Sequence, residues 1–240
     1  MFQRKRKVTT MTAPINLTTI TEPTSVITEQ IKTIRTNINF AATDHELRTL
    51  MVTSAMLGEG KSTVAANLAV EYAKEGLQVL LVDADLRRPT IHKTFGLSNT
   101  QGLSSWLGHQ MTDINQAIHS TIDNLFVMTS GPKPPNPAEL LGSQMMTDFL
   151  TTATSQLDLV IVDAPPVLPV TDSQLLANKV DGTVLVVRQN VAQKAAVRDA
   201  VSDLKRSHAT ILGAVLNDVS DGQHNGYYGY NDGYYSNEEK

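Results

Sequence analysis

The chain has 240 residues, of which 41% are hydrophobic and 18% charged, so it can bury a sizeable core in one large or two small domains. Its formal net charge of −4 is too small to argue for a nucleic-acid-binding protein. It has no cysteine, which excludes a disulfide-stabilised scaffold, cysteine-ligated metal centres and a cysteine nucleophile. No apolar stretch approaches the ~20 residues that cross a bilayer, so we expect a soluble, intracellular chain.

Residues 1–22 are rich in threonine and basic residues and show no periodicity, so we expect a flexible N-terminal segment. The residues after it are apolar at helical spacing, which predicts an amphipathic helix ahead of the first strand. Its apolar positions are Ile27, Ile31, Ile34, Ile38 and Ala41. Glu29, Lys32 and Arg35 fall on the other side of this helix, and an ordinary solvated face is one interpretation of their spacing.

Short apolar runs rich in β-branched residues follow, at 50–52, 79–82, 125–128, 159–162, 184–187 and 211–216. They do not alternate with polar residues, which is typical of strands buried on both faces of a parallel sheet. Segments whose apolar residues have helical spacing lie between these runs. They are clearest over residues 63–76 and in the stripe of Val197, Val201 and Leu204. This pattern predicts one three-layer α/β domain over residues 23–219, with a mostly parallel central sheet and helices on both faces.

The first run is followed by Ala-Met-Leu-Gly-Glu-Gly-Lys-Ser at residues 55–62, which fits a phosphate-binding P-loop with alanine in place of the first glycine. The strand before the loop and the helix after it indicate a P-loop NTPase fold. The residues expected to bind the nucleotide are Gly58, Glu59, Gly60, Lys61, Ser62 and Thr63. Lys61 would neutralise the β- and γ-phosphates and Ser62 would hold the metal, so we expect ATP and Mg²⁺ as ligands.

Three carboxylates follow predicted strands. Asp163 comes directly after the run 159–162, and Asp83 and Asp85 come after the run 79–82. Because ligands of open α/β sheets bind at the carboxyl ends of the strands, we expect these carboxylates beside the P-loop. A carboxylate that merely caps the following helix is the alternative for any one of them.

Residues 220–240 are predicted to be a disordered tail, since they contain almost no aliphatic side chains. Five of the six tyrosines of the chain fall in this tail: Tyr227, Tyr228, Tyr230, Tyr234 and Tyr235. The alternatives are a low-complexity adhesive tail and a platform on which nucleic-acid bases stack. The tail has four acidic residues and one basic residue, a net charge of 1 − 4 = −3, which argues against nucleic acid.

Several of these features resemble the bacterial tyrosine kinases. Asp83-Ala-Asp85, between the P-loop and the aspartate at 163, is similar to their second acidic motif. The segment Gly-Pro-Lys-Pro-Pro-Asn-Pro-Ala-Glu-Leu-Leu at 131–141, the Glu29-x-x-Lys32-x-x-Arg35 spacing and the tyrosine-rich tail also resemble that family. The resemblance covers residue 24 to the C-terminus and is to the cytoplasmic autokinases of capsular and exopolysaccharide synthesis, in the form that Gram-positive bacteria carry as a separate chain.

The resemblance implies an ATP-dependent protein-tyrosine autokinase that phosphorylates the tail of a neighbouring copy. It implies that the catalytic residues are Lys61, Asp83, Asp85 and Asp163. It implies that the metal is held by Ser62, Asp85 and Asp163, and, more weakly, that Asn217 contacts the base. Which of Asp83 and Asp85 accepts the tyrosine proton stays open.

The resemblance also implies partners: a transmembrane activator that holds the kinase at the inner face of the membrane, a cognate tyrosine phosphatase and copies of the chain itself in a ring. Nucleic acid is not among the expected partners. Glu29, Lys32 and Arg35 would contribute to the ring interface. Lys32 stands where the family has arginine, and because lysine cannot form the bidentate fork of arginine, this departure bears on the stability of the ring. Leu57 stands where the family has proline, which is expected to loosen the P-loop slightly without removing a phosphate contact.

A partitioning-type ATPase, which uses the same fold as a nucleotide-dependent switch, is the main alternative. Met56 stands where those ATPases place a second lysine, which counts against them. A scaffold that uses ATP only to assemble beneath a membrane complex is a further alternative. A carrier of metal clusters with this fold is excluded by the missing cysteines.

Overall fold

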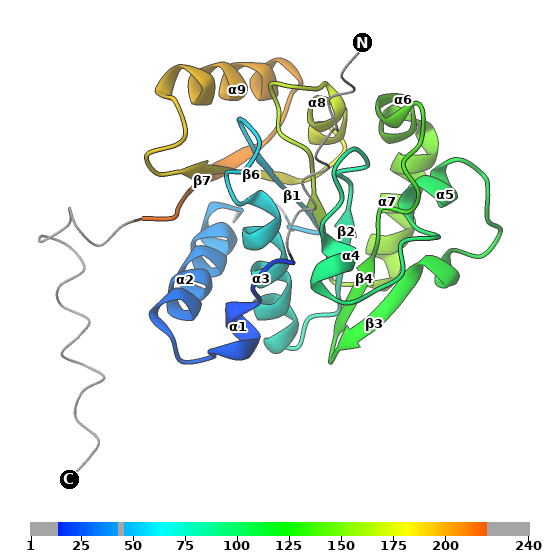
Figure 1. The fold of residues 1–240 in the computed structure, drawn as a ribbon, viewed down its shortest axis with the longest axis horizontal. Coiled ribbons are helices and arrows are strands. Elements are labelled where there is room, and N and C mark those ends of the chain that lie inside the picture. Colours follow the sequence, from blue (N-terminus) through cyan, green and yellow to red (C-terminus); the bar gives the residue numbers. More distant parts are fainter. Residues whose placement is uncertain (1–13, 43–45, 220–240) are drawn as a thin grey trace, which may run out of the picture.

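The computed structural model describes residues 14–42 and 46–219 (Figure 1). Seven strands of this part of the chain form one sheet: β1 (Thr49–Ser54), β2 (Val79–Asp83), β3 (Ile118–Ile122), β4 (Leu125–Met128), β5 (Leu159–Asp163), β6 (Gly182–Arg188) and β7 (Ile211–Asn217). Their order in the sheet is β3-β4-β2-β5-β1-β6-β7. Every neighbouring pair is parallel except β3 and β4. The predicted mostly parallel central sheet is therefore confirmed.

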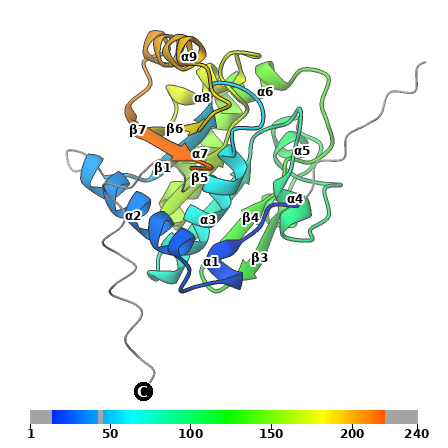
Figure 2. The same ribbon diagram turned by 60° about the vertical axis from the view of Figure 1, so that its left-hand side comes forward.

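Helices cover both faces of the sheet, as expected for three layers (Figures 1 and 2). They are α1 (Thr18–Thr21), α2 (Val26–Ala41), α3 (Lys61–Lys74), α4 (Ile91–Thr94), α5 (Leu103–Leu107), α6 (Pro137–Gly142), α7 (Gln144–Gln156), α8 (Asp172–Ala177) and α9 (Lys194–Arg206). Helices α2 and α3 pack on one face, and α5 to α9 pack on the other. No helix within 14–42 and 46–219 combines the length and the apolarity needed to cross a membrane.

Successive strand residues enter two separate hydrophobic cores, one on each face of the sheet. In β1, Leu50 and Val52 pack beneath α2 and α3, whereas Met51 packs against the opposite layer. In β5, Ile161 and Val162 divide between the two cores in the same way. All five side chains are completely buried. This double burial explains why the strands appear in the sequence as unbroken apolar runs.

The sequence pattern predicts the six other strands but not β3. The β3 sequence Ile-His-Ser-Thr-Ile is only partly buried, and it is an edge strand paired with β4 alone. A short, half-polar strand of this kind lacks the apolar run by which the others are recognised. The helix predicted over 63–76 is α3, and it begins at Lys61.

Residues 14–22 differ from the flexible segment that we expected over 1–22. Within them, α1 packs against α3, and Thr19 donates hydrogen bonds from its N–H and its hydroxyl to Asn67 Oδ1, at 3.1 and 2.9 Å. Thr19 is completely buried. These contacts are made through threonine hydroxyls and backbone groups, so apolar periodicity does not reveal them. Residues 1–13 lie outside the described part of the chain.

The predicted helix after α1 is α2, with Ile31 and Ile38 buried toward α3. Its apolar stripe is buried only in the middle, because Ile27 near its start is 54% exposed and Ala41 at its end is exposed. Ser25 caps the helix by accepting a hydrogen bond from the N–H of Thr28.

Candidate functional site

The P-loop joins β1 to α3 at the carboxyl end of the sheet. Gly58 and Gly60 have φ angles of 79° and 93°, in the left-handed region that favours glycine. The hydrogen bond that starts α3 is donated by Val64 to the carbonyl of Gly60, at 3.0 Å. The N–H groups of residues 61–63, ahead of it in the first turn, therefore point out of the helix end, where the helix dipole favours an anion. Thr63, in this turn, is half-buried.

Lys61 lies at the centre of the site. Its Nζ is 3.0 Å from Asp85 Oδ2, 3.4 Å from Asp163 Oδ1 and 3.1 Å from the hydroxyl of Ser62. Burial alone lowers the pKa of Lys61, but the negative charges of Asp163 and Asp85 outweigh it and the pKa is raised. Lys61 is therefore a permanent cation, as neutralisation of a phosphate requires.

Asp163 ends β5 and is completely buried. Its Oδ1 faces Lys61, while its Oδ2 is buried without a hydrogen-bond partner in the described residues. Burial raises the pKa of Asp163, and the positive charge of Lys61 opposes that effect. A buried acceptor with no partner costs free energy, so this oxygen is suited to a ligand that brings positive charge or a proton.

Asp83 and Asp85 have different surroundings, although they are two residues apart. Asp83 Oδ2 accepts hydrogen bonds from the N–H groups of Thr90 and Ile91, both at 3.1 Å, and its Oδ1 accepts one from the N–H of Asp85, at 3.3 Å. Asp83 thus holds the loop after β2 in place. Burial and the neighbouring negative charge of Asp163 raise the pKa of Asp83 to about 8.

Asp85 points to the P-loop. Its Oδ2 pairs with Lys61, and its Oδ1 accepts a hydrogen bond from the N–H of Arg88, at 2.9 Å. Only 4% of its side chain is exposed. Spacing alone does not distinguish the two aspartates of this motif. In the structure, Asp83 binds the loop after β2 and Asp85 faces Lys61.

These residues fit a divalent cation. When all four groups are ionised, the three negative charges of Asp83, Asp85 and Asp163 and the one positive charge of Lys61 give the buried site a net charge of −2. Mg²⁺ is commonly held by one or two carboxylates together with phosphate oxygens, and the Ser62 hydroxyl and the unpartnered Asp163 Oδ2 are oxygen ligands of the required kind. In residues 14–42 and 46–219 no three His, Cys, Asp or Glu side chains form a group that could hold a metal ion by themselves.

Asn217 ends β7 and lies against the P-loop. Its Nδ2 donates a hydrogen bond to the carbonyl of Glu59, at 3.0 Å. A Cβ on Gly60 would lie 2.0 Å from the same nitrogen, so any side chain at that position would displace Asn217 from this contact. The Glu59 carboxyl is buried, its Oε2 accepts a hydrogen bond from the N–H of Ala55, and burial raises its pKa. Glu59 thus faces the inside of the loop.

Arg188 contacts the P-loop, which the sequence analysis did not predict. It ends β6, and its Nη1 donates a hydrogen bond to the carbonyl of Gly58, at 3.2 Å, while its guanidinium pairs with Asp218, at 2.8 Å. Its position at this edge of the sheet was predictable, since Arg188 directly follows the apolar run 184–187 just as Asp163 directly follows the run 159–162.

Asp172, at the start of α8, was also missed. It is completely buried and accepts a forked pair of hydrogen bonds from Nε and Nη2 of Arg87, both at 2.9 Å. Arg87 follows Asp85 by two residues, and Asp172 lies in the segment that follows Asp163. The fork therefore joins the two segments that carry the strand-end carboxylates Asp85 and Asp163.

Replacing Arg87 with alanine is expected to lower the free energy of unfolding by about 3 kcal/mol, because it leaves a buried carboxylate without its partner. Lysine is expected to restore only part of the loss, since an ammonium group cannot form the fork. Urea unfolding followed by circular dichroism measures both, with Arg198→Ala, an exposed arginine of α9, as the matched control. A loss for Arg87→Ala no larger than that of the control would contradict this role.

The expected ring residues do not all lie on a solvated face. Glu29 and Lys32 form an ion pair of 2.7 Å and are 45% and 39% exposed. Arg35 instead packs against α3, where it donates a hydrogen bond to the carbonyl of Glu71, at 3.0 Å, and pairs with Glu75, at 2.8 Å. Only 13% of the Arg35 side chain is exposed. The long arginine side chain reaches the neighbouring helix, which helical spacing alone does not predict.

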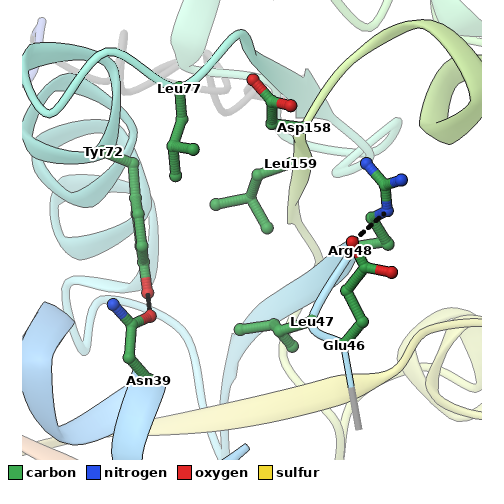
Figure 3. A pocket seen from close by; sticks show the side chains of 8 residues that line it. All are labelled: Asn39, Glu46, Leu47, Arg48, Tyr72, Leu77, Asp158 and Leu159. Atoms are coloured by element: carbon green, nitrogen blue, oxygen red, sulfur yellow. Dashed lines mark hydrogen bonds and ion pairs between the residues drawn. The ribbon is translucent and has the colours of Figure 1, made fainter.

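The five tail tyrosines lie outside the described residues. The sixth tyrosine, Tyr72, is 2% exposed and donates a hydrogen bond to Asn39 Oδ1, at 2.8 Å. It lines a hollow at the end of the sheet opposite the P-loop, where Figure 3 shows its hydroxyl directed at Asn39 and an ion pair between Arg48 and Glu46. Tyr72 is thus inaccessible to a kinase.

A parallel sheet, a P-loop at its carboxyl end and strand-end aspartates around the loop lysine define a P-loop NTPase. In agreement, the family model ParA, described as NUBPL iron-transfer P-loop NTPase, matches residues 47–222. The chain is 46% identical over 222 residues to the tyrosine-protein kinase YwqD of Bacillus subtilis, covering 91% of this chain and 93% of that protein. The chain therefore belongs to the bacterial tyrosine kinases.

Solved structures support the same assignment. The chimerical protein CapA2B2 is 40% identical, with a TM-score of 0.80 and coverage of 86% of this chain and 92% of that one. The kinase domain of the Escherichia coli tyrosine kinase ETK is 33% identical, also with a TM-score of 0.80, and covers 93% of this chain and 89% of that domain. The septum site-determining protein MinD of Pyrococcus horikoshii, at 22% identity and a TM-score of 0.59, shows a similarity of fold alone.

Proposed function

We propose that this kinase transfers the γ-phosphate of ATP to tyrosines of its own C-terminal tail, on a neighbouring copy of the chain. The observation that carries the proposal is the position of Lys61, which lies between Asp85 and Asp163 at the start of the P-loop helix. The tail supplies a dense set of acceptors, five tyrosines within nine residues.

Phosphoryl transfer depends mainly on positioning and on neutralising the charge of the transferred group. The loop N–H groups and Lys61 would hold the phosphates, and Ser62, Asp85 and Asp163 would hold Mg²⁺, which would supply further positive charge to them. A tyrosine hydroxyl has a pKa of ~10, so it needs a carboxylate to accept its proton. Asp85 is the better candidate, because its carboxylate faces Lys61 and the P-loop, whereas that of Asp83 is directed to the N–H groups of the loop after β2.

The tail supports transfer between copies. A flexible segment of 20 residues has a root-mean-square span of ~25 Å, enough to reach a neighbour's site in a ring. Each phosphate adds about −1.5 to −2, so five add roughly −7.5 to −10 to each tail. Like charges gathered in this way repel, and phosphorylation would therefore drive the ring apart. We propose that Glu29 and Lys32, which are half-exposed, contribute to the contacts between copies.

The cellular role follows from the family. We propose that a transmembrane activator of the polysaccharide machinery brings the kinase to the inner face of the membrane, that a tyrosine phosphatase reverses the reaction, and that the cycle regulates capsular or exopolysaccharide synthesis. The names of the relatives support this, since CapB of Staphylococcus aureus and the chimerical CapA2B2 are among them.

Removing residues 221–240 tests this proposal against a partitioning-type ATPase. The truncated kinase is expected to lose all of its own phosphotyrosine, because the one remaining tyrosine, Tyr72, is buried. It is expected to keep its affinity for ATP within about twofold and to phosphorylate an added tail peptide. Phosphotyrosine immunoblots and nucleotide binding measure these properties, and a full-length chain with five Tyr→Phe changes in the tail is the control. A truncated chain that hydrolyses ATP normally but never phosphorylates the peptide would favour the ATPase.

A further inference from the structure

A hollow formed by the proline-rich segment 131–137 has no part in the reaction described above. Its volume is about 330 Å³, and Pro132, Pro134 and Pro135 line it together with Gln110 and Lys133. Pro132, Lys133 and Pro135 are exposed to solvent. Among the residues that line it, Lys133 alone carries a charge.

Hydrogen bonds fix the start of the segment, at Gly131 and Pro132. Asn99 donates from Nδ2 to the carbonyl of Gly131 and accepts from its N–H at Oδ1, both at 2.9 Å. Ser104 donates a hydrogen bond to the carbonyl of Pro132, at 2.7 Å. A Cβ on Gly131, which has a φ of 76°, would lie 2.6 Å from Ser104 Oγ. A surface fixed in this way loses little conformational entropy when it binds a flexible partner.

The proline-rich segment leaves the sheet at the edge where the P-loop lies. Strands β2 and β4 are neighbours, and Val82 is paired with Met128. Asp85 and Gly131 each follow their paired residue by three positions, on strands that lie ~4.8 Å apart. The proline-rich segment therefore starts next to the loop that carries Asp85, at the same edge of the sheet as the P-loop.

We propose that this hollow is a docking site for the tyrosine-rich tail, residues 220–240, of a second copy of the chain, and that it holds one tyrosine ring while another tyrosine lies at Asp85. This inference rests on the proposed function. Proline-rich segments and aromatic side chains pack well against each other, as in the recognition of extended proline-rich peptides. The net charge of −3 on the tail complements Lys133.

For Tyr227, the place from which the tail starts favours a second copy. The last described residue, Val219, follows β7, and four strands separate β7 from β4, a distance of about 24 Å across the sheet. Tyr227 is eight residues beyond Val219, which spans at most about 29 Å when fully extended. Tyr227 therefore reaches the hollow of its own chain only when these eight residues are almost straight, a restriction that the tail of a second copy does not have. Tyr234 and Tyr235, 15 and 16 residues beyond Val219, are less restricted.

Two synthetic peptides of residues 220–240 test the inference. Both keep Tyr227 as the acceptor, and the other four tyrosines are phenylalanine in one peptide and alanine in the other. The enzyme is the full chain with its five tail tyrosines changed to alanine, so that its own tail does not compete. The KM of the alanine peptide is expected to be about tenfold higher than that of the phenylalanine peptide, with kcat within about twofold, because docking needs the ring and not the hydroxyl.

The Lys133→Glu change is expected to raise the KM of the phenylalanine peptide about tenfold. Lys194→Glu, a charge reversal at an exposed lysine of α9, is the matched control and is expected to leave the KM unchanged. Equal KM values for both peptides, with no effect of Lys133→Glu, would overturn the docking site and leave the kinase function intact. If neither peptide is phosphorylated, fluorescence anisotropy of the labelled peptides still measures docking, so that failure of the function and failure of the site are distinguishable.

Discussion

Replacing Lys61 with alanine is expected to reduce tyrosine phosphorylation by at least about 10³-fold. The side chain supplies the one positive charge among three buried carboxylates, and its Nζ lies within 3.4 Å of Asp163 and closer to Asp85. Loss of a single pre-positioned group that stabilises transition-state charge typically costs ~10²–10³ in rate, and here it would also weaken the binding of the phosphates. A phosphotyrosine assay with radiolabelled ATP measures the effect.

Two further variants separate chemistry from folding. Lys61→Met keeps most of the side-chain volume, so a chain that folds normally by circular dichroism but is inactive shows that the charge is required. Lys205→Ala, an exposed lysine of α9, is expected to behave like the parent protein. Phosphorylation by Lys61→Met within tenfold of the parent rate would contradict the role of Lys61.

Replacing Asp163 with asparagine is expected to lower phosphoryl transfer ~10²–10³-fold while making the ligand-free protein more stable. Burial raises the pKa of Asp163 above its ordinary value of 3.8. A carboxyl whose pKa is higher in the folded state lowers stability progressively as the pH rises through the interval between the two values. Asparagine carries no charge at any pH, so the variant escapes this loss, and its Tm at pH 8 is expected to rise by about 2–4 °C.

A phosphotyrosine assay measures the rate of phosphoryl transfer, and thermal unfolding with and without Mg²⁺-ATP measures the Tm and its increase on ligand binding. The parent protein is expected to gain stability from the ligand, since a ligand that binds only the folded state stabilises it. The Asp163→Asn variant is expected to gain little stability from the ligand, because its neutral amide no longer offers a negatively charged oxygen to the metal. Asp199→Asn, at an exposed position of α9, serves as the control. Equal stabilisation of variant and parent by Mg²⁺-ATP would contradict a role of Asp163 at the metal.

The P-loop and the strand-end aspartates were predictable because their chemistry is local. The spacing of Gly58, Gly60 and Lys61 follows from the backbone geometry that surrounds a phosphate, and it is visible in eight consecutive residues. The approach of Asp163 to Lys61 was also predictable in outline, since parallel strands bring their carboxyl ends to one edge of a sheet.

The division of roles between Asp83 and Asp85 was not predictable from their spacing. It depends on the N–H groups of Thr90 and Ile91, which reach Asp83 through the path of the following loop. The same holds for Arg87 and Asp172, which are 85 residues apart in the sequence. Contacts of this kind arise from the packing of distant segments, and a single sequence carries no pattern for them.

The direction of a long side chain is likewise a matter of packing. Helical spacing puts Arg35 on the same side of α2 as Lys32, but the guanidinium turns to the end of α3, where a backbone carbonyl and Glu75 receive it. The polar residues of β3 interrupt the apolar pattern by which the other strands are recognised. An edge strand tolerates them because its side chains stay partly exposed.

The central claim, that this kinase phosphorylates its own tail, is tested most directly by the intact mass of the full chain after incubation with Mg²⁺-ATP. The experiment is run alone, with the cytoplasmic segment of the activator, and with Lys61→Ala. We predict successive additions of about 80 Da, up to five per chain, that removal of the tail tyrosines or of Lys61 abolishes. Turnover of ATP with no gain in mass, even in the presence of the activator segment, would contradict the claim and favour a nucleotide-dependent switch.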